Sequence, residues 1–425
     1  MSTHFTVVIP TRQRCDTLLA CLQTCVEQNY DNCEFIVNDN ASTDQTQEVV
    51  SSFRDPRIRY FNTGERLGLA SNWESALTRV TKDGYVTYIG DDDGLMPDAL
   101  KMASGIMAEI KPRALTCEEV GYHWPSYSRE KLRNHIIIPL TAGLARFDSE
   151  KAIEAVRSFR KPYSHLPMLY RSFIQSSVIK EIVKVQKGAS FFKSMAPDLY
   201  SGIAIGLYLK EYWHCRRPLI VNGTSGHSIG TSSLSPGADH KIAIAVDNEE
   251  KTIQFHENLR TVESIPLLVA ESILQARDHL PFAAGMSFDF RRLSEAALRA
   301  VQYFPPNDYQ RVADAFLQMA SDRDVEAEIK EIINGIPNRP ATNRPLILGV
   351  NIKTKSILLD GSELGLKTVS DASRFAGQFL QLRESGYVTL RGIAASTVKF
   401  LKREIRSRMG SKGLQSDLLT NNVAK

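Results

Sequence analysis

Charged and polar side chains gather in the first hundred residues at the points where short apolar runs end. Four such groups follow one another: Thr11, Arg12 and Arg14; Asn38, Asp39, Asn40 and Asp44; Arg66 and Gly68; and Asp91, Asp92 and Asp93. Carboxylates hold hard divalent cations, and arginines hold phosphate oxygens in a bidentate fork. The combination therefore indicates a site for a nucleotide diphosphate bridged by Mg²⁺ or Mn²⁺.

The aspartate triplet at residues 91–93 is the sharpest of these features. Three adjacent carboxylates repel one another unless a cation or solvent relieves the repulsion. The alternative for the triplet is an acidic, solvated turn in which Gly94 supplies flexibility. Asp39 has an alternative of its own, an Asx turn between strand and helix, which its neighbours Asn38 and Asn40 favour.

The elements that must position these residues alternate between strand and helix patterns. Strands are predicted over residues 5–10, 34–40, 58–63 and 85–93, and helices over 15–28, 41–53, 69–80 and 97–109. Ser42 or Thr43 suits the N-cap of the second helix, and Pro97 suits the first turn of the fourth. Alternation of this kind predicts βαβ units and an α/β fold with a parallel sheet. Ligands bind at the carboxyl ends of such strands, where the four polar groups lie.

Two common nucleotide-binding classes are excluded by the first loop. It contains neither G-x-G-x-x-G nor G-x-x-x-x-G-K-[ST], which argues against a dinucleotide dehydrogenase and a P-loop NTPase.

The pattern loosens after residue 110. A strand is predicted over residues 135–140, and helices over 148–159, 251–280, 291–303 and 307–334, with a proline-punctuated link at 336–345. Residues 162–235 mix short elements with Gly/Ser-rich turns. We therefore expect an α/β domain over residues 1–238, a helical region over 239–335 and a C-terminal region over 346–425.

Composition limits the class of protein. A chain of 425 residues with 43% hydrophobic and 24% charged residues is typical of a globular protein with two or three domains. The net charge of +4 is too small for a protein that coats nucleic acid. It conceals a net −7 over residues 1–100 and a net +6 over residues 386–425. Six cysteines without metal spacing, no secretory leader pattern and no apolar run of about 18 residues predict a cytoplasmic protein.

The motifs VVIPTRQR (residues 7–14), EFIVNDNASTD (34–44) and GDDDGL (90–95) stand in an order that resembles the family 2 glycosyltransferases. The resemblance covers about residues 4–110. It implies a GT-A, Rossmann-like, mostly parallel sheet flanked by helices and followed by a mainly helical C-terminal extension. It also implies metal-assisted, inverting transfer of a sugar from a nucleotide sugar, which we expect to be UDP-linked. The expected acceptor is a glycan or lipid-linked hydroxyl, with a role in cell-surface polysaccharide synthesis.

The resemblance also implies roles for residues at the strand ends. Pro10, Thr11, Arg12 and Arg14 would line the nucleotide pocket. Asp39 would hydrogen-bond the base, and Arg66 would lie near the nucleotide. Asp91, Asp92 and Asp93 would form the D-x-D element, with Asp92 facing the ribose or sugar and Asp93 binding the Mn²⁺ or Mg²⁺. Asn38 stands where many members carry a second Asp, so the base contact depends on Asp39.

Two further roles come from the same resemblance. The general base is expected about a hundred residues past the D-x-D at a helix start, where Pro197 and Asp198 lie. An acid there also simply complements the helix dipole. His227 is the first candidate for a further metal or phosphate contact, and His214 is the second. A solvated loop histidine is the alternative for His227.

Three interpretations stay open. Residues 398–409 form a basic amphipathic pattern that suits either peripheral contact with the inner face of the cell membrane or docking on the body of the protein. A different enzyme class, a haloacid-dehalogenase-like phosphohydrolase, would use Asp91 and Asp93, although its loop normally follows the first strand. A non-catalytic homologue that binds nucleotide sugars is the third interpretation.

Trp124, Trp213 and Tyr200 would stack on sugars or else lie in the core.

Overall fold

The computed structural model describes residues 2–228, 249–262, 264–340 and 346–385. Its N-terminal part contains the expected alternation, with each polar group of the sequence at a strand end. The elements are β1 (Phe5–Thr11), α1 (Cys15–Val26), β2 (Cys33–Asp39), α2 (Thr46–Ser52), β3 (Ile58–Asn62), α3 (Leu69–Thr78), β4 (Tyr85–Tyr88), β5 (Gly94–Leu95) and α4 (Ala99–Ile110).

Strands β3, β2, β1 and β4 lie side by side in that order and are parallel. Because β1 pairs with both β2 and β4, the loops after these three strands meet at one edge of the sheet. The α/β class predicted from the sequence is confirmed, with this parallel group at its centre.

The remainder of the sheet is mixed. It contains β6 (Ala114–His123), β7 (His135–Pro139), β8 (Leu144–Asp148), β9 (Ser172–Gln175) and β10 (Glu211–Thr224). β9 runs antiparallel to both β4 and β6, whereas β10 runs parallel to β6 and antiparallel to the short β5. The parallel core is therefore continued by a mixed group of strands, in which β7 confirms the strand predicted over residues 135–140 and the pairing of the others was not predicted.

Helices cover both faces of the sheet. On one face, Phe5, Val7 and Ile9 of β1 pack with α1 and α4 in one core, and on the other face Val8 packs with α3. The second core also takes in α6 (Ser176–Val185) and α7 (Pro197–Tyr208). α5 (Ser149–Arg157) contributes Ile153 to it. Successive side chains of β1 point to opposite faces of the sheet. The strand is mostly apolar because both of these faces are buried.

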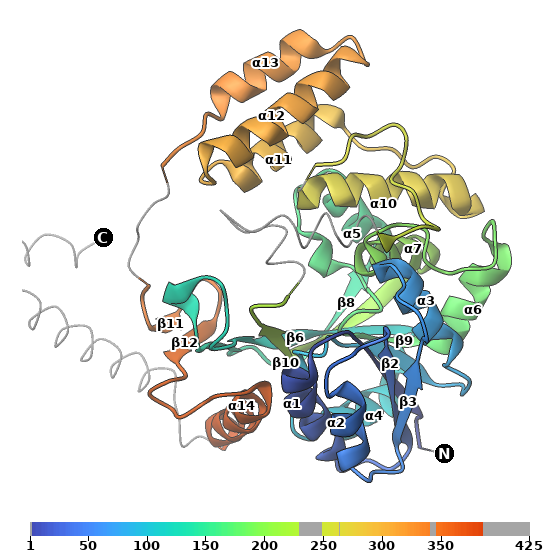
Figure 1. Ribbon diagram of the computed structural model, residues 1–425, viewed down its shortest axis with the longest axis vertical. Helices are drawn as coiled ribbons and strands as arrows, with labels where there is room; N and C mark the ends of the chain where they lie inside the picture. Colours follow the sequence, from blue (N-terminus) through green and yellow to red (C-terminus); the bar gives the residue numbers. More distant parts are fainter. Residues whose placement is uncertain (1, 229–248, 263, 341–345, 386–425) are drawn as a thin grey trace, which may run out of the picture.

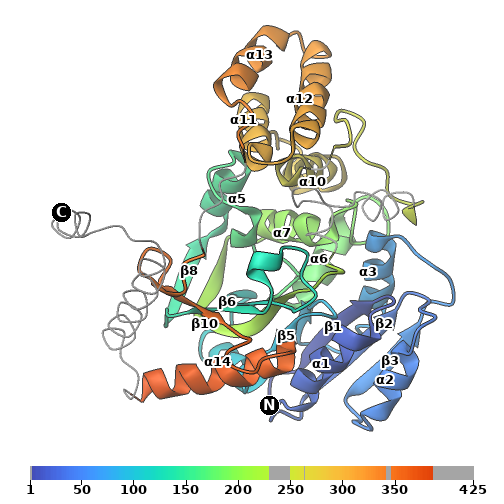
Figure 2. The same cartoon turned by 60° about the vertical axis from the view of Figure 1, so that its left-hand side comes forward.

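A helical region stands on this second face (Figure 2). It comprises α10 (Ile265–His279), α11 (Phe290–Val301), α12 (Pro306–Ser321) and α13 (Glu326–Gly335), which share a core of their own. α10 belongs to both cores, because Val269 and Ile273 face α7 while Leu267 and Leu274 face α11 and α12.

Three predicted helix boundaries are wrong. The helix expected over residues 251–280 begins at Ile265, and the helix expected over 307–334 is divided into α12 and α13. The second helix of the chain begins at Thr46 instead of near Ser42, because the Ser42 hydroxyl accepts a hydrogen bond from the Gln13 backbone N–H. Periodicity alone did not locate these ends.

The last described residues return to the α/β part. β11 (Gly349–Asn351) and β12 (Ser356–Asp360) add to the sheet beside β7, and α14 (Val369–Glu384) lies against α1 (Figure 1). The Ser373 hydroxyl donates to the Leu95 carbonyl at 2.7 Å, and Arg374 pairs with Glu27 of α1. The C-terminal region thus packs against the sheet that carries the strand-end residues.

No helix among the described residues is long and apolar enough to span a membrane. The basic pattern at residues 398–409 lies outside the described residues.

Candidate functional site

Asp91 joins the ends of β1 and β4. The Thr11 hydroxyl donates to one carboxylate oxygen of Asp91 at 2.7 Å, and Nη1 of Arg14 donates to the other at 2.9 Å. Arg14 also donates to the backbone oxygen of His227. Thr11, Arg14 and Asp91, which are far apart in the sequence, therefore form one buried unit as their strand-end positions predicted.

Asp93 is 0% exposed, and both of its carboxylate oxygens are hydrogen bonded within the protein. Oδ2 accepts from the Tyr170 hydroxyl and the Gly90 backbone N–H, both at 2.8 Å, and Oδ1 accepts from the Gly223 N–H at 2.8 Å. Burial raises the pKa of Asp93 to about 7, although Arg171 opposes the shift. These contacts favour a structural role for Asp93 over the metal contact expected from the sequence.

Asp92, unlike Asp93, accepts hydrogen bonds from described residues at only one of its two carboxylate oxygens. Its Oδ2 accepts from the Ser225 backbone N–H, the Ser225 hydroxyl and the Ser228 hydroxyl at 3.2, 2.7 and 2.5 Å. Its Oδ1 accepts no hydrogen bond from any described residue. Gly223 permits this packing because a Cβ there would overlap the Asp92 carbonyl oxygen. Asp92 is the carboxylate of the triplet with an oxygen left for a ligand.

Asp39 is the last residue of β2, and its carboxylate accepts hydrogen bonds from the loop that follows and from β3. Oδ1 accepts from the Ser42 backbone N–H, three residues further on, at 3.0 Å, one residue beyond the spacing of the Asx turn named above as the alternative. Oδ2 accepts from the Tyr60 hydroxyl at 2.7 Å and the Asn62 amide at 3.0 Å. Asn38 is buried and donates to the Asn72 side-chain oxygen at 2.8 Å. Asn38 and Asp39 thus stabilise the end of β2 through hydrogen bonds. A contact between Asp39 and the base of the nucleotide stays a prediction.

Arg12 and Arg66 come together from the loops after β1 and β3. Nη1 of Arg12 lies 2.5 Å from one Glu249 oxygen, and Nη2 of Arg66 lies 2.7 Å from the other. Pro10 precedes Thr11, the last residue of β1, and is partly exposed. The structure therefore brings these two arginines to one place, with an acidic partner that the sequence pattern did not indicate.

Asp198 stands in the first turn of α7, with Pro197 at the helix start as predicted. Burial raises the pKa of Asp198, while the Leu199 backbone N–H and the positive charge of Arg171 oppose the shift. A carboxylate with a raised pKa at a helix start is suited to accept a proton. Arg171 also interacts electrostatically with Asp93, so one cation acts on both the triplet and Asp198.

The segment at Tyr170 and Arg171 is the principal feature missed by sequence reasoning. Nη1 of Arg171 donates to Glu119 of β6 at 2.7 Å, and its guanidinium lies 4.3 Å from the Tyr170 ring centroid. The backbone of Arg171 is left-handed with φ 60°. No motif marks these residues, and only the packing of β9 against β4 and β6 brings them beneath the triplet.

The two candidate histidines occupy different sites. His227 is exposed in the turn at residues 225–228 whose serines hold Asp92, so the fold brings it to the triplet. His214 lies on β10, where the Thr116 hydroxyl bonds its Nδ1 at 2.8 Å and Glu118 pairs with it. Tyr200 and Trp124 are buried, as the core alternative predicted.

The donor set at the triplet fits a cation that is also held by phosphate. The described residues contain no group of three His, Cys, Asp or Glu side chains placed to hold a metal ion. Mg²⁺ typically takes one or two carboxylates plus phosphate oxygens and water, so a single carboxylate such as Asp92 is compatible with a cation that a bound diphosphate also holds.

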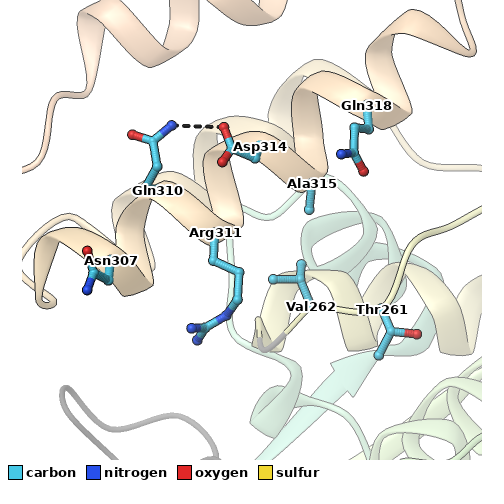
Figure 3. A pocket seen from close by; sticks show the side chains of 8 residues that line it. All are labelled: Thr261, Val262, Asn307, Gln310, Arg311, Asp314, Ala315 and Gln318. Carbon is cyan, nitrogen blue, oxygen red and sulfur yellow. Dashed lines mark hydrogen bonds between the residues drawn. The ribbon is translucent and has the colours of Figure 1, made fainter.

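A surface pocket of about 450 Å³ lies in the helical region, away from these residues. Figure 3 shows α12 side chains facing the segment before α10, with the Gln310 amide donating to Asp314 at 2.8 Å. The lining residues are Thr261, Val262, Asn307, Gln310, Arg311, Asp314, Ala315 and Gln318. These lining residues include one carboxylate and no histidine or cysteine, so we assign the chemistry to the strand ends.

Comparisons with known proteins point to the same part of the chain. Residues 6–162 match the family model described as Glycosyl transferase family 2. A chondroitin synthase of Escherichia coli is 26% identical over 148 residues, which are 31% of this chain and 21% of the relative. A GalNAc(5)-diNAcBac-PP-undecaprenol beta-1,3-glucosyltransferase of Campylobacter jejuni is 33% identical over 97 residues, which are 22% of this chain and 31% of the relative. The chain thus spans about a third or less of the length of these curated relatives.

Among solved structures, Staphylococcus aureus TarS 1-349 in complex with UDP-GlcNAc is similar, with a TM-score of 0.47 and 14% identity. The alignment covers 78% of this chain and 91% of that chain.

Proposed function

Because residues 6–162 form a glycosyl transferase family 2 domain, we propose that the protein transfers a sugar from a nucleotide diphosphate sugar to an acceptor hydroxyl. The observation that supports this most strongly is the contact of Arg14 and Thr11 with Asp91 of the triplet 91–93 at the ends of β1 and β4. Cationic and metal-binding groups beside each other are what a diphosphate leaving group requires.

The donor is proposed to be UDP-linked. The name of another relative, a UDP-Glc:alpha-D-GlcNAc-diphosphoundecaprenol beta-1,3-glucosyltransferase of Escherichia coli, 31% identical over 78 residues, supports this choice. In the proposal, Pro10, Thr11 and Arg14 shape the pocket floor, Arg12 and Arg66 contact the phosphates or ribose, and Asp39 lies nearest the base.

Asp92 and His227 are proposed to hold the Mn²⁺ or Mg²⁺, in place of Asp93. The reason is that both oxygens of Asp93 already accept hydrogen bonds within the protein, whereas Oδ1 of Asp92 accepts none from any described residue. When bound, the cation would offset the negative charge of the departing nucleoside diphosphate.

Asp198 is the proposed general base. It accepts the proton of the acceptor hydroxyl while that oxygen forms a bond to the anomeric carbon, and the bond from that carbon to the diphosphate breaks. Attack from the side opposite the leaving group inverts the anomeric centre. The partly buried position and raised pKa of Asp198 support this role.

The acceptor class is proposed from the printed names of the relatives. They include polysaccharide synthases, undecaprenol-linked sugar transferases and a putative colanic acid biosynthesis glycosyl transferase. We therefore propose a glycan or lipid-linked acceptor in cell-surface polysaccharide synthesis. Residues 386–425 would bring the enzyme to the inner face of the membrane, and deleting them should move it from the membrane fraction to the supernatant.

Thermal-shift titrations with UDP, GDP and UDP-sugars, each with and without Mn²⁺, test the donor proposal. The expected result is a rise in melting temperature with UDP compounds that Mn²⁺ enlarges, since ligands stabilise the state they bind. Release of UDP from a UDP-sugar on addition of acceptor then tests transfer. Release of phosphate from sugar phosphates with Mg²⁺, and no stabilisation by any nucleotide, would instead indicate a phosphohydrolase.

A further inference from the structure

Residues 249–252 contact the two loops that carry Arg12 and Arg66, the arginines proposed to bind the nucleotide. These loops are far from residues 249–252 in the sequence. One oxygen of Glu249 lies 2.5 Å from Nη1 of Arg12 and the other lies 2.7 Å from Nη2 of Arg66. A single carboxylate therefore bridges two guanidinium groups, one from the loop after β1 and one from the loop after β3.

The next residue, Glu250, fixes this segment to the start of α3. Its Oε2 accepts from the Ser71 backbone N–H at 3.1 Å, and its Oε1 accepts from the hydroxyls of Ser71 and Thr252 at 2.7 Å each. A helix N-terminus attracts negative charge, so the position suits a carboxylate. Gly68 makes the approach feasible, because a Cβ there would overlap the Glu250 side chain and backbone.

These contacts use the chemistry by which a nucleotide diphosphate would be held. Arginine pairs and helix N-termini are general binding elements for phosphate oxygens, and the two glutamates place carboxylate oxygens on both elements at once. The negative charge of the two glutamates would repel an incoming phosphate. The phosphate would also find the N–H donors of the arginines and of the helix start already occupied by the glutamates.

We propose that residues 249–252 form an acidic strap that competes with the phosphates of the nucleotide for Arg12, Arg66 and the start of α3, and so restrains donor binding. This inference rests on the proposed function. It adds an autoinhibitory contact that the family match, which ends at residue 162, does not include.

The apparent dissociation constant of the nucleotide equals the intrinsic constant divided by the fraction of molecules in which the strap is open. Partly exposed ion pairs of this kind each shift an equilibrium about 1.4- to fivefold, so two of them correspond to a closed state that weakens nucleotide binding about two- to thirtyfold.

The test is UDP titration by calorimetry, with Mn²⁺, of wild type, Glu249→Gln and the matched control Glu257→Gln. Glu257 is an exposed glutamate a few residues further along the chain. We expect Glu249→Gln to bind UDP about two- to thirtyfold more tightly, and the control to bind as wild type does. Equal or weaker binding by Glu249→Gln overturns the strap while leaving the proposed function intact.

Limited trypsin digestion gives a second readout that does not need catalysis. Lys251 is exposed inside the strap, so its cleavage reports release of the segment from the arginines. We expect Glu249→Gln to be cut after Lys251 faster than wild type, and UDP to accelerate this cut in wild type. Protection of Lys251 by UDP would overturn the strap, and a lack of UDP binding by both proteins would overturn the proposed function.

Discussion

Glu271 lies inside the contact between α10 and the segment leading into α7, and its carboxyl group should make stability depend on pH near neutrality. The side chain is 0% exposed. The Ser194 hydroxyl donates to one oxygen at 2.5 Å, and the Gln275 amide donates to the other at 2.8 Å. Burial raises the pKa of Glu271 to about 7, although these two hydrogen bonds oppose the rise.

The sign of the effect follows from the raised pKa. The folded protein binds this proton more tightly than the unfolded chain does, so the stabilisation is fully present below pH 4.5 and is lost as the pH rises through 7. A rise from 4.5 to about 7 corresponds to about 3 kcal/mol, at about 1.4 kcal/mol for each pH unit.

The substitution Glu271→Gln tests this value because glutamine has the shape of the protonated acid and cannot ionise. Between pH 4.5 and 8, the free energy of unfolding of the variant relative to wild type should rise by about 3 kcal/mol. Urea unfolding followed by circular dichroism at several pH values measures this difference. Other titrating groups, Asp93 among them, cancel in the comparison.

Glu109→Gln is the matched control, because Glu109 is exposed on α4. Its difference from wild type should stay nearly constant with pH. A constant offset for Glu271→Gln would refute the reasoning, because it would mean that a hydrogen bond was lost but that no buried carboxyl titrates.

Three further predictions concern the candidate site. Asp198→Asn should lower the transfer rate about 10²–10⁴-fold while UDP affinity changes less than twofold, as measured by product assay and calorimetry; full activity would exclude Asp198 as the base. Asp92→Asn should remove the effect of Mn²⁺ on UDP binding, whereas Asp93→Asn should chiefly lower the melting temperature, and the reverse pattern would restore Asp93 as the metal ligand. Gly223→Ala should displace the Asp92 carbonyl and abolish the Mn²⁺ effect in a protein with unchanged far-ultraviolet circular dichroism; retained Mn²⁺ dependence would show that the turn tolerates the methyl group.

Much of the N-terminal half could be predicted from sequence because its signals are local. The β-branched run at β1, the alternation with α1 and the polar residues at each strand end depend on neighbours in the chain. The rule that parallel strands end at one edge then brought Thr11, Arg14 and Asp91 together, and their hydrogen bonds bear this out.

Boundaries were less predictable where a distant contact competes with local preference. Ser42 suited a helix N-cap, but its hydroxyl instead accepts from the Gln13 N–H, so α2 begins at Thr46. The half of the expected helix 251–280 that precedes Ile265 includes Thr252, whose hydroxyl is hydrogen bonded to the Ser71 hydroxyl on α3 at 2.8 Å.

The sequence by itself determined which side chains are available at the strand ends, because strand and helix periodicity is a property of adjacent residues. Tertiary structure decided which of those side chains stay open to a ligand. Tyr170 and Gly223 occupy Asp93, Ser225 takes one oxygen of Asp92, and Glu249 bridges the arginines. Each partner comes from a segment far along the chain, and only the packing of β9 and β10 into the sheet, and of residues 249–252 over the loops, brings it into hydrogen-bond range.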